Sequence, residues 1–276
     1  MAEVLQAASR ESMASAQARL DAYVDSAQAP DLQRLGDEVF AVTRLLVEQR
    51  SLRRLLADPS SPESARTGLV DRLLGRQLAA PTLDIAKQLV ASRWSRPADL
   101  VTAFESVARL ALLAVAEKDG SLDDVEDELF RFGRVLDREP ELASLLADTT
   151  TPADQRISLL DRLIEGKVSP VTAVLLRQSV RLPRGRHLDV VCEELAELAA
   201  ARRDRSIARV TAPVALSAEQ EQKLTDSLTS LYGHPMSLQV ELDPQLLGGL
   251  VVRVGGEVID GSVASKLAAA RRALPR

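Results

Sequence analysis

Residue patterns that could perform chemistry occur in a few places along this sequence, and none of them is complete. The acidic run at 123–127 could supply paired carboxylates for acid–base catalysis, but it lies on an amphipathic helix that needs a solvated face. Asp260-Gly261-Ser262 is not a nucleophile elbow, and no histidine is near it in the sequence. Gly166-Lys167 is followed by valine where a phosphate-binding loop has serine or threonine. We therefore expect no catalytic residues and no cofactor.

Metal-binding and redox chemistry have equally little support. The sequence holds one cysteine, Cys192, and two histidines, His187 and His234, too few for a zinc site assembled by spacing. A single cysteine excludes an internal disulfide, so we expect Cys192 to be a small core residue in a reducing compartment. We expect no bound metal ion.

Charge and hydropathy restrict the possible partners. The chain has 276 residues, a formal net charge of −5 and an isoelectric point near 5.3. Nucleic acid is not an expected partner, because phosphate binding needs a dominant basic face. The longest purely apolar run, residues 110–116, is far shorter than the roughly 20 residues that span a membrane. The first twenty residues lack the basic and apolar regions of a secretory signal. These patterns favour a protein on the cytoplasmic side without a membrane span.

The first two hundred residues have the apolar period of helices, and they repeat at an offset of 90 residues. Ser61-Pro62 and Thr151-Pro152 each place a capping hydroxyl before a proline, which predicts a helix start in each copy. No amphipathic helix buries its stripe alone, so each copy is predicted to be a bundle of about six short helices. The repeated apolar stripe consists of Leu35, Val39, Val42 and Leu46, and then of Val125, Leu129, Phe132 and Leu136.

The two copies are predicted to share one helix. The last helix of the first copy and the first helix of the second copy project onto the same residues, which predicts one continuous helix over 98–117. Such a helix would hold the bundles in a fixed orientation rather than on a flexible tether. We place the first bundle at 1–106 and the second at 107–204.

From residue 205 onward the apolar period changes from that of helices to that of strands, apart from one helix. Ser217 and Gln220 form a capping box that opens this helix between two predicted strands. A hairpin through Gly255-Gly256 and a closing helix capped by Asp260 or Ser262 follow. The predicted fold class is therefore mainly α: two tandem six-helix bundles related by a 90-residue repeat, and then a small α/β domain with a β-hairpin at 205–276.

The end of the chain resembles a known family. Its stretch from residue 243 to residue 267 is similar to the C-terminal signature of the F-type ATP synthase delta subunit, called the oligomycin-sensitivity-conferring protein in mitochondria. The second bundle also resembles the family, through residues 114–130, whereas the family has one bundle, so the first bundle is interpreted as a duplication. The signature residues are Asp243, Gly248, Gly249, Gly255, Asp260, Gly261 and Ser262.

This resemblance implies a structural, non-catalytic subunit of the peripheral stalk, present as one copy per complex. It implies a link between the alpha/beta catalytic head and the membrane-anchored b subunit, on the cytoplasmic face of the cell membrane. By holding the head against the torque of the rotor, such a subunit lets proton flow drive ATP synthesis. A generic cytoplasmic helical adaptor that binds amphipathic helices is the alternative; it explains the bundles but not the C-terminal signature.

The resemblance also implies binding surfaces. The family's bundle receives an amphipathic N-terminal helix of alpha in a groove between its first and fifth helices, here 11–28 with 81–93, or 101–118 with 170–181. The candidate groove residues, which are also of the kind that fills a bundle core, are Ala14, Ala18, Leu83 and Ala86 in the first copy and Leu112, Val115, Val174 and Gln178 in the second. For the C-terminal end of b, the candidates are Val263, Lys266, Leu267 and Arg271. The sequence leaves open which bundle binds alpha.

Overall fold

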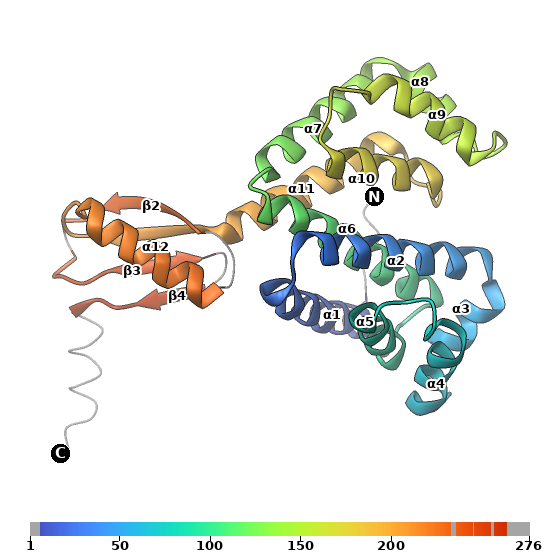
Figure 1. Cartoon of the computed structure of the whole chain (residues 1–276), viewed down its shortest axis with the longest axis horizontal. Coiled ribbons are helices and arrows are strands. Elements are labelled where there is room, and N and C mark those ends of the chain that lie inside the picture. Colours follow the sequence, from blue (N-terminus) through green and yellow to red (C-terminus); the bar gives the residue numbers. More distant parts are fainter. Residues whose placement is uncertain (1–5, 233–235, 245, 255–256, 264–276) are drawn as a thin grey trace. The chain divides into compact units, whose positions relative to one another are not determined.

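The computed structural model describes residues 6–232, 236–244, 246–254 and 257–263. The chain divides into two compact units, Met1–Ala199 and Ala200–Arg276 (Figure 1). The first unit is helical, and the second combines a helix with a small sheet, which confirms the predicted mainly α class.

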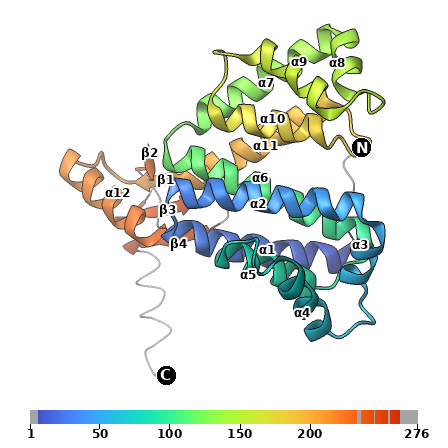
Figure 2. The same cartoon turned by 45° about the vertical axis from the view of Figure 1, so that its right-hand side comes forward.

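Two helical bundles make up the first unit, and they lie on opposite sides of one central helix, α6 (Figure 2). The first bundle consists of α1 (Ala7–Ser26), α2 (Ala29–Glu48), α3 (Arg50–Ala57), α4 (Glu63–Leu74), α5 (Ala80–Ala91) and α6 (Pro97–Lys118). The second bundle begins with the same α6 and continues with α7 (Leu122–Arg138), α8 (Pro140–Ala147), α9 (Ala153–Ile164), α10 (Pro170–Arg181) and α11 (Leu188–Ser206).

Helix α6 confirms the predicted shared helix, because it runs without interruption from Pro97 to Lys118. Of its 22 residues, 17 are buried, including Leu100, Phe104 and Leu113. A helix that is apolar on all sides is stable in water only when neighbours cover all of its faces. The two bundles provide that cover, and α6 therefore belongs to the core of both.

The repeat extends to individual hydrogen bonds. A carboxylate oxygen of Glu38 accepts the backbone N–H of Ala79 at 2.9 Å, and Glu128 accepts the N–H of Ser169 at 2.9 Å. Buried Arg66 donates to the carbonyl oxygens at the end of α5, and Arg156 donates in the same way at the end of α10. These bonds satisfy helix-end carbonyls that have no partner within their own helix.

The predicted capping by Ser61 and Thr151 is wrong in detail. Helices α4 and α9 begin one residue later than expected, with Pro62 and Pro152 at the N-cap positions. The Thr151 hydroxyl donates instead to Asp148 at 3.0 Å. Asp148 also accepts the hydroxyl and N–H of Thr150, which together hold the pKa of this carboxyl below its usual value. Hydrogen bonds to a carboxylate are strong, and the bond to Asp148 fixes the Thr151 hydroxyl in the turn that precedes α9.

The second unit has a four-stranded mixed sheet in the order β2-β1-β3-β4. Strand β1 pairs in parallel with β2 and antiparallel with β3, and β3 pairs antiparallel with β4, which confirms the predicted hairpin. The N–H of Ser217 donates to Gln220 at 2.9 Å and the N–H of Gln220 donates to the Ser217 hydroxyl, as the capping box predicts. The elements are β1 (Ile207–Ala212), α12 (Ala218–Tyr232), β2 (Ser237–Leu242), β3 (Val251–Val254) and β4 (Glu257–Asp260).

Candidate partner-binding surfaces

The family-like signature builds a tight backbone crossing in the second unit. Gly248 and Gly249 have φ values of +136° and +80°, a region that strongly favours glycine. A Cβ atom on Gly249 would lie 2.4 Å from the carbonyl oxygen of Gly261, so a side chain cannot fit there. The N–H of Val263 donates to the Gly248 oxygen at 2.9 Å, and the N–H of Ser262 donates to Asp260 at 2.9 Å. The signature therefore joins the segments at 248–249 and 260–263 into one structure.

Apolar side chains on or next to this crossing remain exposed. Val263 is 40% exposed and Leu247 is 80% exposed, and Val258 and Ile259 on β4 are exposed as well. Asp243 lies at the other end of the loop, where its N–H donates to the oxygen of Ala212 at 2.8 Å. The remaining candidates of this region, Gly255, Lys266, Leu267 and Arg271, and the rest of the predicted closing helix lie outside the described residues.

The candidate groove of the first bundle lies between α1 and α5. Ala14 and Ala18 are exposed on α1, Leu83 is half-buried on α5, and Ala86 is buried within the bundle. Two contacts join the helices beside these residues. Arg19 forms an ion pair with Asp84, and the amide of Gln88 donates to the backbone oxygen of Ser15 at 3.2 Å.

The candidate residues of the second bundle are covered to a greater extent. Leu112 and Val115 on α6 are buried, and Val174 and Gln178 on α10 are half-buried. The side chain of Gln178 accepts a hydrogen bond from Arg44 of α2, which belongs to the first bundle. The structure thus places Leu112 and Gln178 where the second bundle meets α2 of the first.

A buried cluster of charges near the middle of α6 was not predicted from the sequence. Glu105 accepts Arg109 at 2.7 Å and Arg184 at 2.5 Å, and it also contacts Arg186. Burial alone would raise the pKa of Glu105, but the charges of the three arginines outweigh it and hold the pKa below its usual value. The only sequence signal was a Glu and an Arg four residues apart in an otherwise apolar helix. The cluster fixes the segment before α11 against α6.

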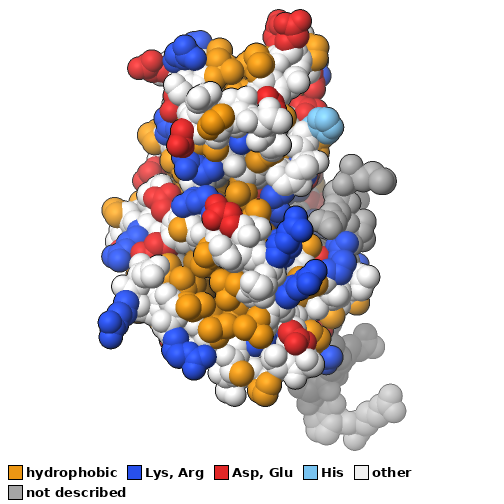
Figure 3. All heavy atoms as spheres, turned by 90° about the vertical axis from the view of Figure 1, so that its right-hand side faces the viewer, with side chains coloured by type: hydrophobic (Ala, Val, Ile, Leu, Met, Phe, Trp, Pro, Cys, Tyr) orange, Lys and Arg blue, Asp and Glu red, His pale blue; other side chains and the backbone are white. Residues whose placement is uncertain are grey.

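One face of the helical unit, which carries α3, shows an apolar patch bordered by Lys and Arg side chains (Figure 3). A cavity of about 620 Å³ lies beside α3, lined among others by Arg54, Leu55 and Trp94. Leu55 is half exposed, whereas Trp94 is buried and its indole N–H donates to the oxygen of Leu89 at 2.7 Å. Trp94 therefore serves the core of the first bundle.

The described residues contain no arrangement that resembles a reaction centre. Among them, no group of three or more potential metal ligands is placed around a common point. Burial and, to a smaller extent, the nearby charge of Asp189 raise the pKa of the Cys192 thiol to about 12, so this thiol is unreactive at neutral pH. No helix in the described ranges combines the length and apolar character needed to cross a membrane.

Comparisons with known proteins agree with the fold and the signature. A sequence model of the family described as ATP synthase delta (OSCP) subunit matches residues 107–274, which include the second bundle and the C-terminal unit. ATP synthase subunit delta of Streptomyces avermitilis is 46% identical over 265 residues, 96% of this chain and 97% of the relative. ATP synthase subunit delta of Frankia alni is 44% identical over 277 residues, 99% of this chain and all of the relative. ATP synthase subunit b-delta of Mycobacterium sp. strain KMS is 43% identical over 271 residues, 98% of this chain but 61% of the relative.

Proposed function

Because the chain belongs to the ATP synthase delta (OSCP) family, we propose that its two units hold two different partners, the alpha subunit at the helical unit and the b subunit at the C-terminal unit. The chain is a structural subunit of the peripheral stalk of an F-type ATP synthase. One copy per complex would tie the alpha/beta head to b on the cytoplasmic face of the cell membrane.

The mechanical task of a stalk is to resist torque rather than to react with a substrate. Each step of the rotor pushes the head around, and a stalk that yields would let the head turn without making ATP. The shared helix α6 and the Glu105 cluster give the helical unit the required stiffness, since they leave no flexible linker between its bundles. The uninterrupted helix α6, shared by both bundles, is the observation that supports the proposal for the helical unit.

The proposed contact with alpha uses a helix in a groove. An amphipathic helix buries its apolar face best where two helices present small or apolar side chains side by side. Ala14 and Ala18 on α1, next to Leu83 on α5, provide such a surface. Binding would therefore come from apolar burial with few charged contacts.

The proposed contact with b lies at the C-terminal unit. The Mycobacterium relative named b-delta supports this proximity, because its printed name joins b and delta in one chain. Val263 and the exposed apolar residues beside the glycine crossing supply an apolar surface. Leu267 would add to its apolar contacts with b, and Lys266 and Arg271 would add positive charge. The generic adaptor hypothesis loses its support, since relatives over nearly the whole chain are delta subunits.

Removal and replacement of the chain on membrane vesicles tests this function. Vesicles depleted of the chain should lose ATP-driven proton pumping, while the ATPase activity of the released head persists. Adding the purified chain together with the heads should restore pumping. Full pumping by depleted vesicles would contradict a role in the stalk.

A substitution in the C-terminal unit tests the contact with b. Val263→Glu should weaken capture of the chain by the cytoplasmic part of b at least tenfold, because it places a charge in an apolar interface. Val214→Glu is the matched control, since Val214 is 68% exposed in the loop after β1 and is not one of the signature residues. Equal capture of both variants would reject the assignment of Val263.

A further inference from the structure

We infer that helix α2 of the first bundle fills the helix-binding groove of the second bundle, so that the chain offers one open groove, between α1 and α5. This inference rests on the proposed function, because it names the bundle that receives the alpha helix. The second groove has two walls, α6 and α10, and residues of α2 contact both of them.

Helix α2 lies directly against the α6 wall. A Cβ atom on Gly36 would lie 2.8 Å from Cδ2 of Leu112, and Gly36 itself is buried. The absence of a side chain at this position lets the two helices approach more closely than ordinary residues allow. Leu112 is one of the four candidate groove residues, so α2 occupies the space in front of it.

About two turns after Gly36, helix α2 also contacts the α10 wall. The guanidinium of Arg44 donates to the Gln178 side chain at 3.2 Å, although the two residues are 134 positions apart. Burial lowers the pKa of Arg44, and the nearby charge of Arg181 lowers it further, which places both arginines at this junction. Gln178 is a second candidate groove residue that α2 covers.

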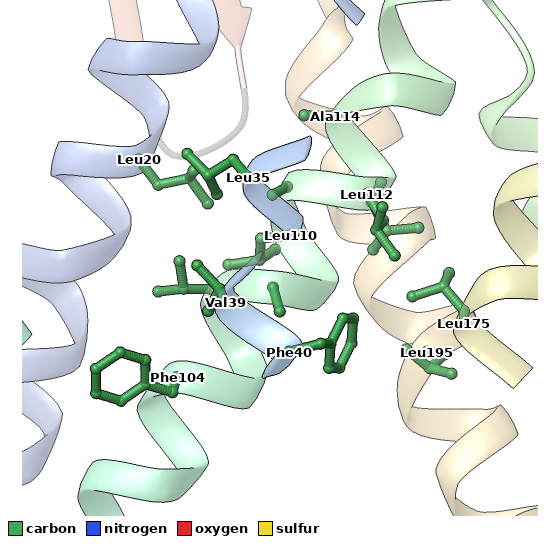
Figure 4. Packing of buried hydrophobic residues seen from close by; sticks show 14 of the residues in the cluster. Leu20, Leu35, Val39, Phe40, Phe104, Leu110, Leu112, Ala114, Leu175 and Leu195 are labelled. Atoms are coloured by element: carbon green, nitrogen blue, oxygen red, sulfur yellow. The ribbon is translucent and has the colours of Figure 1, made fainter. Parts of the chain in front are cut away.

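Phe40 lies between these two contacts. Its ring points away from Val39 and toward Leu175 of α10 and Leu195 of α11 (Figure 4). The side chain is 5% exposed, and all three leucines around it, including Leu112, are fully buried. Phe40 is therefore an apolar anchor that one bundle inserts against the other.

The repeat supplies an internal comparison for this face of α2. The position matching Gly36 in the second copy is Glu126, and the position matching Val47 is Asp137. On α7 these two positions are charged; Glu126 is half-buried and Asp137 is exposed. In the first copy the matching residues are Gly36, which is buried against Leu112, and the half-buried Val47, so this face of α2 carries no charge at either position.

The corresponding groove of the first bundle stays open. Ala14 and Ala18 are exposed, and α1 packs against α5 and α6 within the described part of the chain. Their small side chains allow a helix to approach closely, as Gly36 does on α2. The occupant that fits is one amphipathic helix of the α2 type, which the proposed function identifies as the N-terminal helix of alpha.

Binding stoichiometry of the whole chain tests the inference. The probe is a synthetic peptide of the first 25 or so residues of the alpha subunit encoded with this chain, titrated by calorimetry. We expect one peptide per chain and at least a tenfold loss of affinity in Ala18→Glu. Ala65→Glu, on the exposed side of α4, is the matched control and should bind normally.

A variant in which α2 is cross-linked to α10 distinguishes peptide binding at the first groove from binding at the second. Cysteines introduced by Arg44→Cys and Gln178→Cys can be bridged with a short bismaleimide while buried Cys192 stays unmodified. The bridged chain should bind one peptide with unchanged affinity, because α2 never leaves its groove. Two peptides per chain, or loss of binding on bridging, would overturn the inference and leave the alpha contact standing. No binding by any form of the chain would overturn the alpha contact and the inference with it.

Discussion

Phe40 and Phe130 occupy the same position of the 90-residue repeat, yet Phe40 is 5% exposed and Phe130 is 59% exposed. The difference follows from their places in the tandem array. Phe40 on α2 faces the second bundle, whereas the described structure has no third bundle to cover Phe130 on α7. Tandem repeats bury their internal faces and leave their terminal faces to solvent or to partners.

This pair makes a direct prediction about stability. Phe40→Ala should lower the free energy of unfolding of the helical unit by about 3 kcal/mol, because it leaves a cavity between the bundles. Phe130→Ala should change it by less than about 0.5 kcal/mol, as is usual for exposed positions. Urea unfolding followed by circular dichroism measures both. Equal losses in the two variants would contradict the packing of α2 against the second bundle.

The Glu105 cluster predicts a pH dependence. The pKa of Glu105 is below its ordinary value of 4.5 in the folded chain, so its ionised form stabilises the fold above about pH 4.5. This contribution is lost as the pH falls through the folded pKa. Glu105→Gln should lower the free energy of unfolding by about 3 kcal/mol at neutral pH, because it removes the buried carboxylate that three arginines share. The difference in stability between this variant and the parent chain should become smaller in acid.

Thermal unfolding between about pH 3 and pH 8 checks this dependence. Glu219→Gln is the control, since its ion pair with Lys223 is exposed and such pairs contribute about 0.5 kcal/mol or less. If the difference in unfolding temperature between Glu105→Gln and the parent chain stayed constant from neutral to acid pH, ionisation of Glu105 would not be what stabilises α6.

Cys192 should not react with thiol reagents while the chain is folded. Its pKa of about 12 means that about one thiol in ten thousand is ionised near pH 8, and the side chain is fully buried. A coloured disulfide reagent should therefore react at the rate of unfolding, and rapidly with one thiol per chain in concentrated guanidinium chloride. Fast stoichiometric labelling of the native chain would contradict the packing of α11.

Gly249 should be indispensable to the C-terminal unit. Gly249→Ala places a Cβ atom against the Gly261 oxygen at a φ of +80°, a conformation that alone costs alanine about 1 to 2 kcal/mol. Amide exchange in β3 should accelerate at least tenfold, while exchange in α6 stays unchanged. Gly68→Ala is the control, because a Cβ atom on Gly68 meets nothing within 4 Å and alanine favours the helix. Unchanged exchange in β3 would show that the glycine crossing is dispensable.

Much of this fold followed from patterns within single elements. The 90-residue offset predicted α6 as a shared helix, and the change of period predicted the strand, helix, strand and hairpin order of the second unit. These features depend on local periodicity, which the sequence displays directly. The predicted caps at Ser61 and Thr151 failed because both hydroxyl groups donate to an aspartate of the preceding turn, Asp58 or Asp148, and each helix begins one residue later than predicted.

The candidate site was less accessible to sequence reasoning. The repeat predicted two equivalent grooves, and the contact that distinguishes them joins Arg44 to Gln178 across 134 residues. The Glu105 cluster likewise gathers Arg184 and Arg186 from about 80 residues away. Such contacts depend on how complete bundles pack, so they become visible only in three dimensions.

Purification of the tagged chain from its own membranes in mild detergent, with mass spectrometry of what stays bound at high salt, tests the central claim most directly. We expect recovery of alpha, beta, gamma and b in a fixed ratio, with one copy of this chain per complex. Recovery of the chain alone, or with unrelated soluble proteins, would contradict a place in the peripheral stalk and restore the helical adaptor as the working hypothesis.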